Sequence, residues 1–169
     1  MHGLTLGAGA GALALMSCLA VAQTSTHVAE VVDNTGKRIG AATFQGGKSA
    51  TVIRVELAAG ALTPGWHGIH LHAVCDCSDH AKFQASKGHV NHGGRKHGLL
   101  NPEGPDDGDL PNIHAGADGS VTAEVVTSTL LSTLKDADGS ALVIHAAADD
   151  HMTQPIGGAG ARVACGLVK

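Results

Sequence analysis

The sequence predicts an all-β fold, a sandwich or barrel of about seven or eight short strands. Short β-like segments alternate with turn signals at intervals of roughly 8–12 residues. No stretch shows the apolar period of an amphipathic helix. The 169 residues include two phenylalanines, one tryptophan and no tyrosine. The core must therefore consist mainly of valine, isoleucine, leucine and alanine.

Seven segments are typical of strands. In residues 49–57, Ile53, Val55 and Leu57 fall on one face and Val52 on the other, as in a half-buried strand. Clusters of Asp, Asn, Thr, Ser and Gly separate the segments as turns. The expected strands cover residues 27–32, 37–45, 49–57, 66–73, 121–127, 141–146 and 162–168.

Long irregular segments interrupt these strands. Residues 70–109 are polar and contain six histidines, and residues 147–161 form a second irregular segment. A loop as long as the first is normally disordered or functional. His70 and His72 lie two apart on a strand, so their side chains project from one face. Nitrogen-rich sites suit copper and mixed His/Asp sites suit zinc, so this loop predicts metal binding. Residues 128–139 are expected to form a loop or a poor helix.

The first 22 residues predict export. They are small and apolar, contain no Asp, Glu, Lys or Arg, and end in Ala20-Val21-Ala22. This is typical of a secretory signal peptide cut before Gln23, which leaves one domain over residues 23–169 in the periplasm or outside the cell. After cleavage no stable membrane insertion is expected. A membrane anchor and a lipoprotein site at Leu15-Met16-Ser17-Cys18 are the alternatives.

Charge and cysteine content narrow the class further. The formal net charge is −4 with acids and bases scattered, which argues against a nucleic-acid partner. Export leaves Cys75, Cys77 and Cys165 in the mature chain. In an oxidising compartment, one disulfide and one free thiol is the simplest arrangement of three cysteines.

Several motifs, taken together, suggest a family. Residues 65–72 are Gly-Trp-His-Gly-Ile-His-Leu-His, and residues 157–166 are Gly-Gly-Ala-Gly-Ala-Arg-Val-Ala-Cys-Gly. Between them lie Gly88-His89-Val90-Asn91, Lys96-His97-Gly98, Gly108-Asp109-Leu110-Pro111-Asn112, and His145 followed by Asp149-Asp150. This order resembles the copper/zinc superoxide dismutases of the bacterial periplasmic branch, over roughly residues 27–169. The resemblance implies an eight-stranded Greek-key barrel or sandwich, immunoglobulin-like, with two long functional loops. That family is itself a known sandwich fold, so the two fold predictions are not independent.

The resemblance also implies a role for each matching residue. Asp149 would be the carboxylate behind the ligands, hydrogen-bonded to one histidine of each metal. His89 would bridge the two metals as an imidazolate, and Cys77 would pair with Cys165. The implied copper ligands are His70, His72, His89 and His145, and the implied zinc ligands include His89, His97 and Asp109.

Arg162 matches the arginine that faces the open copper position in this family. A fixed guanidinium there would attract and orient an anion. The implied reaction converts two superoxide anions and two protons to O₂ and H₂O₂ by copper redox cycling, with His89 leaving copper and carrying a proton. Superoxide is thus the expected partner, and a homodimer is among the assemblies that the resemblance allows.

Three positions depart from the family pattern. Asp106 occupies the place of the third zinc histidine; a carboxylate can ligate zinc, so Asp106 is retained in the expected zinc set. The alternative is a weakened or empty zinc site in a copper-dominated protein. His92 stands where proline is usual. Cys75 replaces a common glycine and could compete with Cys77 for Cys165.

Two functions therefore compete. The first is an exported superoxide dismutase, favoured by the four copper histidines and Arg162. The second is a non-catalytic, dismutase-like protein that stores or delivers copper, with a degenerate zinc site. A plain adhesion module leaves the ligand cluster unexplained. His67 is expected to be a packed structural residue, and the additional histidines His80, His92, His114 and His151 are expected to be mostly solvated, with auxiliary copper binding as their alternative role.

Overall fold

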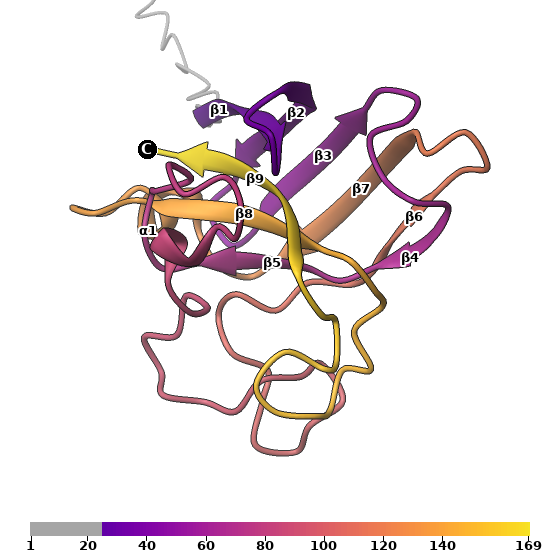
Figure 1. Cartoon of the computed structure of the whole chain (residues 1–169). Coiled ribbons are helices and arrows are strands. Elements are labelled where there is room, and N and C mark those ends of the chain that lie inside the picture. Colours follow the sequence, from indigo (N-terminus) through magenta and orange to yellow (C-terminus); the bar gives the residue numbers. More distant parts are fainter. Residues whose placement is uncertain (1–24) are drawn as a thin grey trace, which may run out of the picture.

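The computed structural model describes residues 25–169, so the predicted signal segment lies outside the described part of the chain. Within these described residues, nine strands form two antiparallel sheets (Figure 1). The large sheet has the spatial order β5-β8-β9-β1-β2-β3-β7, and the small one pairs β4 with β6. β9 returns to lie beside β1, an arrangement of the Greek-key type. The strands are β1 (Ser25–Asp33), β2 (Arg38–Gly46), β3 (Thr51–Leu57), β4 (Gly65–His67), β5 (Ile69–His72), β6 (Ile113–Ala115), β7 (Val121–Thr127), β8 (Ser140–His145) and β9 (Arg162–Val168).

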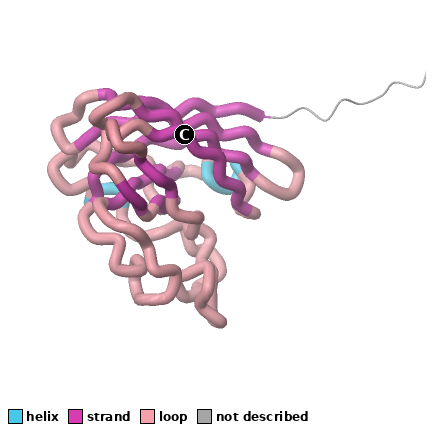
Figure 2. Tube along the Cα trace, turned by 90° about the vertical axis from the view of Figure 1, so that its right-hand side faces the viewer, coloured by secondary structure: helices cyan, strands magenta, loops and turns pink. Residues whose placement is uncertain are grey.

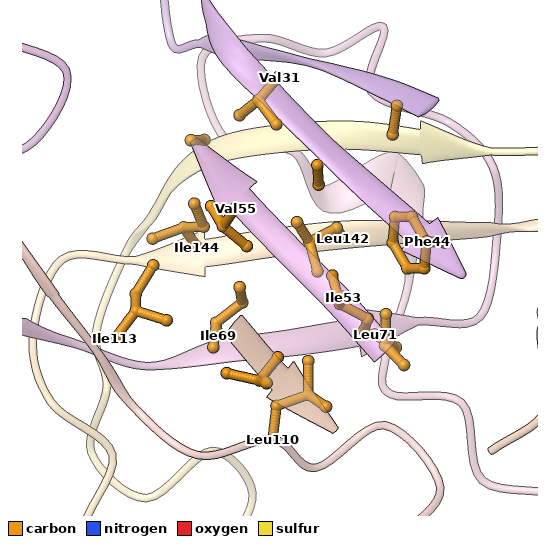
Figure 3. Close-up of a cluster of buried hydrophobic side chains, with 14 of the residues drawn as sticks. Val31, Phe44, Ile53, Val55, Ile69, Leu71, Leu110, Ile113, Leu142 and Ile144 are labelled. Carbon is orange, nitrogen blue, oxygen red and sulfur yellow. The ribbon is translucent and has the colours of Figure 1, made fainter. Parts of the chain in front are cut away.

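The large sheet curls into a half-barrel whose inner face carries the apolar core (Figure 3). Phe44 of β2 and Ile53 of β3 share one buried cluster with Leu71 of β5 and Leu142 of β8. All four side chains are 0% exposed. Full burial of such a side chain contributes about 1.5–3 kcal/mol, so apolar packing is the main source of stability for this part of the molecule.

The predicted all-β fold is confirmed, and β7 and β9 have the predicted bounds. The strand expected at residues 66–73 is divided at Gly68, whose N–H donates to Ala147 O and whose carbonyl accepts from His145 N, both at 2.8 Å. Before Gly68 the chain pairs with β6, and after it with β8. A Cβ at Gly68 would lie 2.8 Å from the Ala159 methyl, so this crossing requires glycine. With β4 and β5 counted as one interrupted strand, the sheet system has the eight strands expected. Strand β6 was not predicted, because three residues are too short to establish an alternation.

Two long loops, residues 73–112 and 146–161, lie together at one end of the sheet (Figures 1 and 2). The first contains a short 3₁₀ turn, η1 (Gln84–Ser86), and it covers the outer face of β8. There Phe83 packs against Ala141 and Val143 in a second buried cluster. This explains why β8 is buried on both faces. The segment expected to be a loop or poor helix contains a single helical turn, α1 (Leu131–Leu134). Within residues 25–169, no helix has the length and apolar character needed to span a bilayer.

Candidate metal centre

Strand alternation places three of the predicted copper histidines together. Ile69 and Leu71 of β5 point into the core, so His70 and His72 project from the opposite face. β8 runs antiparallel beside β5, and His145 ends it after a bulge at Ile144/His145. One ligand atom from each of His70, His72 and His145 lies within 4.8 Å of the others. All three side chains are 0% exposed.

His89 joins this group from the first loop. An isolated bridge pairs its backbone with His72. Its ring centroid lies 4.3 Å from that of His70 and 5.2 Å from that of His72. The four imidazoles predicted to bind copper thus form one cluster, which we call the strand cluster (His70, His72, His89 and His145).

Each member of the strand cluster has one buried ring nitrogen without a hydrogen-bond partner among the described residues. For His72 and His145 the other nitrogen, Nδ1, donates to a backbone carbonyl, Lys87 O at 2.8 Å and Gly160 O at 3.1 Å. Because Nδ1 carries the proton, Nε2 presents a lone pair. The unpartnered atoms are His70 Nδ1, His72 Nε2, His89 Nε2 and His145 Nε2. Such a set of neutral nitrogen donors suits copper.

Burial and neighbouring charges keep the rings of His70, His72 and His145 neutral. Burial lowers the pKa of His70 and lowers that of His72 well below its usual value, and the charge of Arg162 acts in the same direction on His72. Burial and the neighbouring His70 lower the pKa of His145 to about 3. A neutral imidazole is the form that ligates metals, so these three rings are ready to coordinate a metal near neutral pH.

A second group, the loop cluster, consists of His89, His97, Asp106 and Asp109, which offer ligand atoms within 4.8 Å of one another. His89 Nδ1 lies 2.9 Å from Asp106 Oδ2 and 3.6 Å from Asp109 Oδ1. His97 Nδ1 lies 2.5 Å from Asp109 Oδ1. The Asp106 carboxylate therefore faces the His89 ring. Two imidazoles and two carboxylates form a donor set that fits zinc.

The loop cluster carries concentrated negative charge. Burial disfavours charged His97, but hydrogen bonds to Asp109 and Asp149 outweigh burial and raise its pKa to about 10. Burial alone would raise the pKa of Asp109, yet hydrogen bonds from His97 and the Gly98 N–H lower it. In the metal-free protein, protonated His97 is thus the cation that compensates these carboxylates. A divalent ion would serve the same electrostatic purpose.

Asp149 connects the two clusters. His70 Nε2 donates to its Oδ2 at 2.7 Å, and His97 Nε2 lies 3.2 Å from its Oδ1. These two hydrogen bonds lower the pKa of the Asp149 carboxyl, although its burial opposes them. With His70 Nε2 protonated, His70 Nδ1 is left as the donor atom.

Arg162 lies beside the strand cluster at the start of β9. A cavity of about 270 Å³ is lined by Arg162, His72, His89, Arg95 and Gln154, among others. Arg162 Nη1 donates to Phe83 O at 2.7 Å and to Ser86 Oγ at 3.0 Å, which fixes the guanidinium. Burial lowers the pKa of Arg162, but guanidinium remains charged at any physiological pH. Two guanidinium groups and one carboxylate, that of Asp106, line the cavity, so positive side chains outnumber the negative one and the cavity is suited to a small anion.

The expected disulfide is present. Cys77 and Cys165 are bonded, with a Cα–Cα distance of 5.9 Å, and they tie the first loop to β9. Cys75 is unpaired within residues 25–169, so the competition considered for Cys165 is decided in favour of Cys77.

The remaining histidines of residues 25–169 lie outside both clusters. His67 is a packed structural residue, as expected: its ring nitrogens face His145 O at 2.7 Å and Thr63 O at 2.8 Å. His92 is exposed, with Asp107 and Asp136 each 3.7 Å from its ring nitrogens. The sequence does not predict the backbone groups that orient rings of the strand cluster, such as the carbonyls of Lys87 and Gly160. Backbone atoms leave no side-chain pattern from which they could be found.

A curled Greek-key sheet with adjoining nitrogen-rich and carboxylate-rich clusters is typical of a β-protein with a two-metal centre. The family model described as copper/zinc superoxide dismutase (SODC) matches residues 38–168. The chain therefore belongs to the copper/zinc superoxide dismutase family, a family of enzymes that use copper and zinc, which confirms the resemblance.

Comparisons with individual proteins lead to the same family. A Cu-Zn superoxide dismutase of Caulobacter vibrioides is 49% identical over 143 residues, covering 79% of this chain and 80% of the relative. A solved superoxide dismutase-like protein from Bacillus subtilis has a TM-score of 0.77 and 30% identity, over 87% of this chain and 100% of that one. The Cu/Zn superoxide dismutase from Brucella abortus has a TM-score of 0.71 and 31% identity, over 86% and 100%.

Proposed function

We propose that this protein is an exported superoxide dismutase that converts two superoxide anions and two protons to O₂ and H₂O₂. The observation that carries the proposal is the set of four buried imidazole nitrogens without partners, beside a cavity lined by Arg162. Membership of the copper/zinc superoxide dismutase family supports the same activity.

The donor sets fit two metals. Copper would be held by His70, His72, His89 and His145, and zinc by His89, His97, Asp106 and Asp109. When bound, copper supplies one-electron redox chemistry, which couples oxidation of one superoxide to reduction of another. His89 belongs to both sets, with Nε2 toward the strand cluster and Nδ1 toward the loop cluster.

The protein's own groups would bind the anion and handle protons. The Arg162 guanidinium would attract superoxide into the cavity and orient it, because its other contacts hold it in place. His89 Nε2 would take up a proton and transfer it to the peroxide product, and water would supply the second proton. The carboxylates at His89 Nδ1 keep the ring oriented while Nε2 is free.

The test uses protein beginning at Gln23, loaded with copper and zinc. Stopped-flow consumption of superoxide should be fast, and Arg162→Ala should slow it about ten- to a hundredfold at low salt, since a fixed cation accelerates anion encounter by such factors. Arg54→Ala, on β3 and exposed, is the matched control and should leave the rate unchanged. Tight copper binding without turnover would contradict the enzyme and favour the copper store.

Whether the loop cluster binds zinc is tested separately, by measuring the zinc content of the purified protein. Protein purified with excess zinc should contain one zinc per chain, because Asp106 and Asp109 face His89 and His97 within ligand distances of one another. A zinc-free product from the zinc-rich preparation would refute the retained site. This result would leave the copper proposal standing.

Export is the remaining part of the proposal. A disulfide between Cys77 and Cys165 fits the periplasm or the cell exterior. Cell fractionation and sequencing of the mature amino terminus should give an extracytoplasmic protein that starts at Gln23. A cytoplasmic product that retains residues 1–22 would contradict it. Gel filtration of the mature protein would show whether it is a homodimer.

A further inference from the structure

Two primary amides fasten the long loops to each other. Asn112, at the end of the first loop, binds both backbone groups of Asp149: Asp149 N–H donates to its Oδ1 at 2.9 Å, and its Nδ2 donates to Asp149 O at 2.8 Å. Gln154, in the second loop, does the same to His97: His97 N–H donates to its Oε1 at 3.1 Å, and its Nε2 donates to His97 O at 2.7 Å. Each loop therefore supplies one amide that holds the backbone of a residue in the other loop.

The two residues held in this way contact each other, since His97 Nε2 lies 3.2 Å from Asp149 Oδ1. The loops approach closely beside them. Leu100 N–H donates to His151 O at 3.1 Å, and a Cβ at Gly98 would lie 2.3 Å from the same oxygen. Gly98 has a φ of 118°, a conformation that glycine adopts readily. The backbone around His97 is thus placed against the second loop by several specific contacts.

We propose that Gln154 is a positioning residue for His97. By accepting from the N–H and donating to the carbonyl of one residue, its amide fixes both the position and the rotation of that peptide segment. The His97 ring then reaches Asp109 through Nδ1 and Asp149 through Nε2 at the same time. Gln154 also lines the cavity that contains Arg162, so it joins a zinc ligand to the wall of the anion cavity.

The proposal rests on the zinc site proposed above. Gln154 is largely exposed, so water can replace its hydrogen bonds in part. Loss of a partner that orients a metal ligand typically weakens metal binding ten- to a hundredfold. We expect about the lower limit here, because the partner holds the backbone of His97 rather than its ring.

The experiment compares Gln154→Met with Gln45→Met in the full chain. Methionine keeps the length of glutamine and removes both hydrogen bonds; Gln45 is an exposed residue of β2 and serves as the matched control. Three quantities are measured: the Zn²⁺ dissociation constant by chelator competition, the visible spectrum of Co²⁺ in the zinc site, and hydrogen exchange at the His97 amide of metal-free protein. Gln154→Met should weaken zinc about tenfold, alter the cobalt spectrum and speed exchange at His97. The thermal midpoint of the metal-free protein should stay unchanged.

Unchanged zinc affinity and His97 exchange in Gln154→Met would overturn the proposal, as would an equal loss in Gln45→Met. If Gln154→Met does not fold, Gln154→Glu decides: it keeps the acceptor for His97 N–H and loses the donor to His97 O. Zinc binding at least threefold weaker supports the role, and unchanged binding refutes it. A wild type that binds zinc but consumes no superoxide refutes the proposed dismutase activity alone. A wild type that binds no zinc overturns the role of Gln154 together with the zinc site, and leaves the copper proposal standing.

Discussion

The curled sheet and the two long loops maintain order by different means. In the sheet, aliphatic side chains such as Ile53 and Leu142 are fully buried and the backbone is paired in ladders. In the loops, order depends on side chains that bind the backbone, as Asn112 and Gln154 do, and on the Cys77–Cys165 bond. The stability of the sheet therefore follows apolar area, and that of the loops follows charge, hydrogen bonding and the covalent link.

The two metal clusters repeat this contrast. Strand geometry and burial supply neutral nitrogen donors at His70, His72 and His145. The loop cluster instead gathers carboxylates around His97 and needs a cation for charge balance. The strand cluster thus needs no metal for charge balance, whereas in the loop cluster a metal ion would compensate the charge of the carboxylates.

Removal of the disulfide should have the largest effect on the loops. The Cys77–Cys165 bond joins positions 88 residues apart, and the chain-entropy relation gives about 4–5 kcal/mol for such a closure. The double variant Cys77→Ala/Cys165→Ala should lose about that much free energy of unfolding in urea titration. A loss below about 1 kcal/mol would mean that the loop is held to β9 mainly by the packing of Phe83.

A core truncation should damage the sheet without affecting the sites. Ile53→Ala removes a fully buried side chain from β3 and should cost about 2–5 kcal/mol in the free energy of unfolding. Val126→Ala, at a side chain that is 58% exposed on β7, is the control and should cost under about 0.5 kcal/mol. Copper and zinc content after purification should match the wild type in both variants. Metal loss in Ile53→Ala would show that the sheet and the loops are not independent.

Asp106 provides a narrower test of the loop cluster. Asp106→Ala should weaken zinc about ten- to a hundredfold, which corresponds to about 1.4–2.7 kcal/mol, because it removes a carboxylate that faces His89. Asp106→His, which restores a nitrogen ligand, should bind zinc within about tenfold of the wild type. Equal zinc affinity of the alanine variant and the wild type would show that Asp106 is not a ligand.

The pH dependence of the metal-free protein should be gradual and two-sided. The pKa of His145 is lowered to about 3, so its stabilising contribution is complete above about 6.5 and is lost as pH falls toward 3; His70 and His72 act in the same direction. His97, with its pKa raised to about 10, contributes below about 6.5 and loses this contribution as pH rises through 10. Denaturant titrations at several pH values should give a maximum near neutrality. Stability that increases from neutral pH to about pH 4.5 would contradict this account.

The sequence predicts the regular elements better than their interruptions. The alternation in β3 and the bounds of β7 and β9 follow from local pattern. The order of the motifs predicts which side chains form the two clusters. The division at Gly68 does not follow, because it depends on which strands lie on either side of β4 and β5. The choice of Cys77 over Cys75 was available from the resemblance and not from the count of cysteines.

The connections between the loops were also beyond local pattern. An exposed glutamine such as Gln154 resembles any solvated loop residue until His97, 57 positions away, is seen against its amide. The same is true of the carbonyls that orient His72 and His145. Their partners are set by the path of the folded chain and leave no trace in spacing.

The four residues of β5 have a consequence for folding fidelity. Ile69 and Leu71 pack in the core, whereas His70 and His72 lie in the strand cluster, so alternate positions of one strand have two unrelated roles. A slip of one residue against β8 would turn the histidines into the core and the aliphatic side chains toward the ligands. A mispaired sheet can therefore neither pack nor capture metal. Metal binding therefore stabilises only the chain in which β5 and β8 are paired in the correct register.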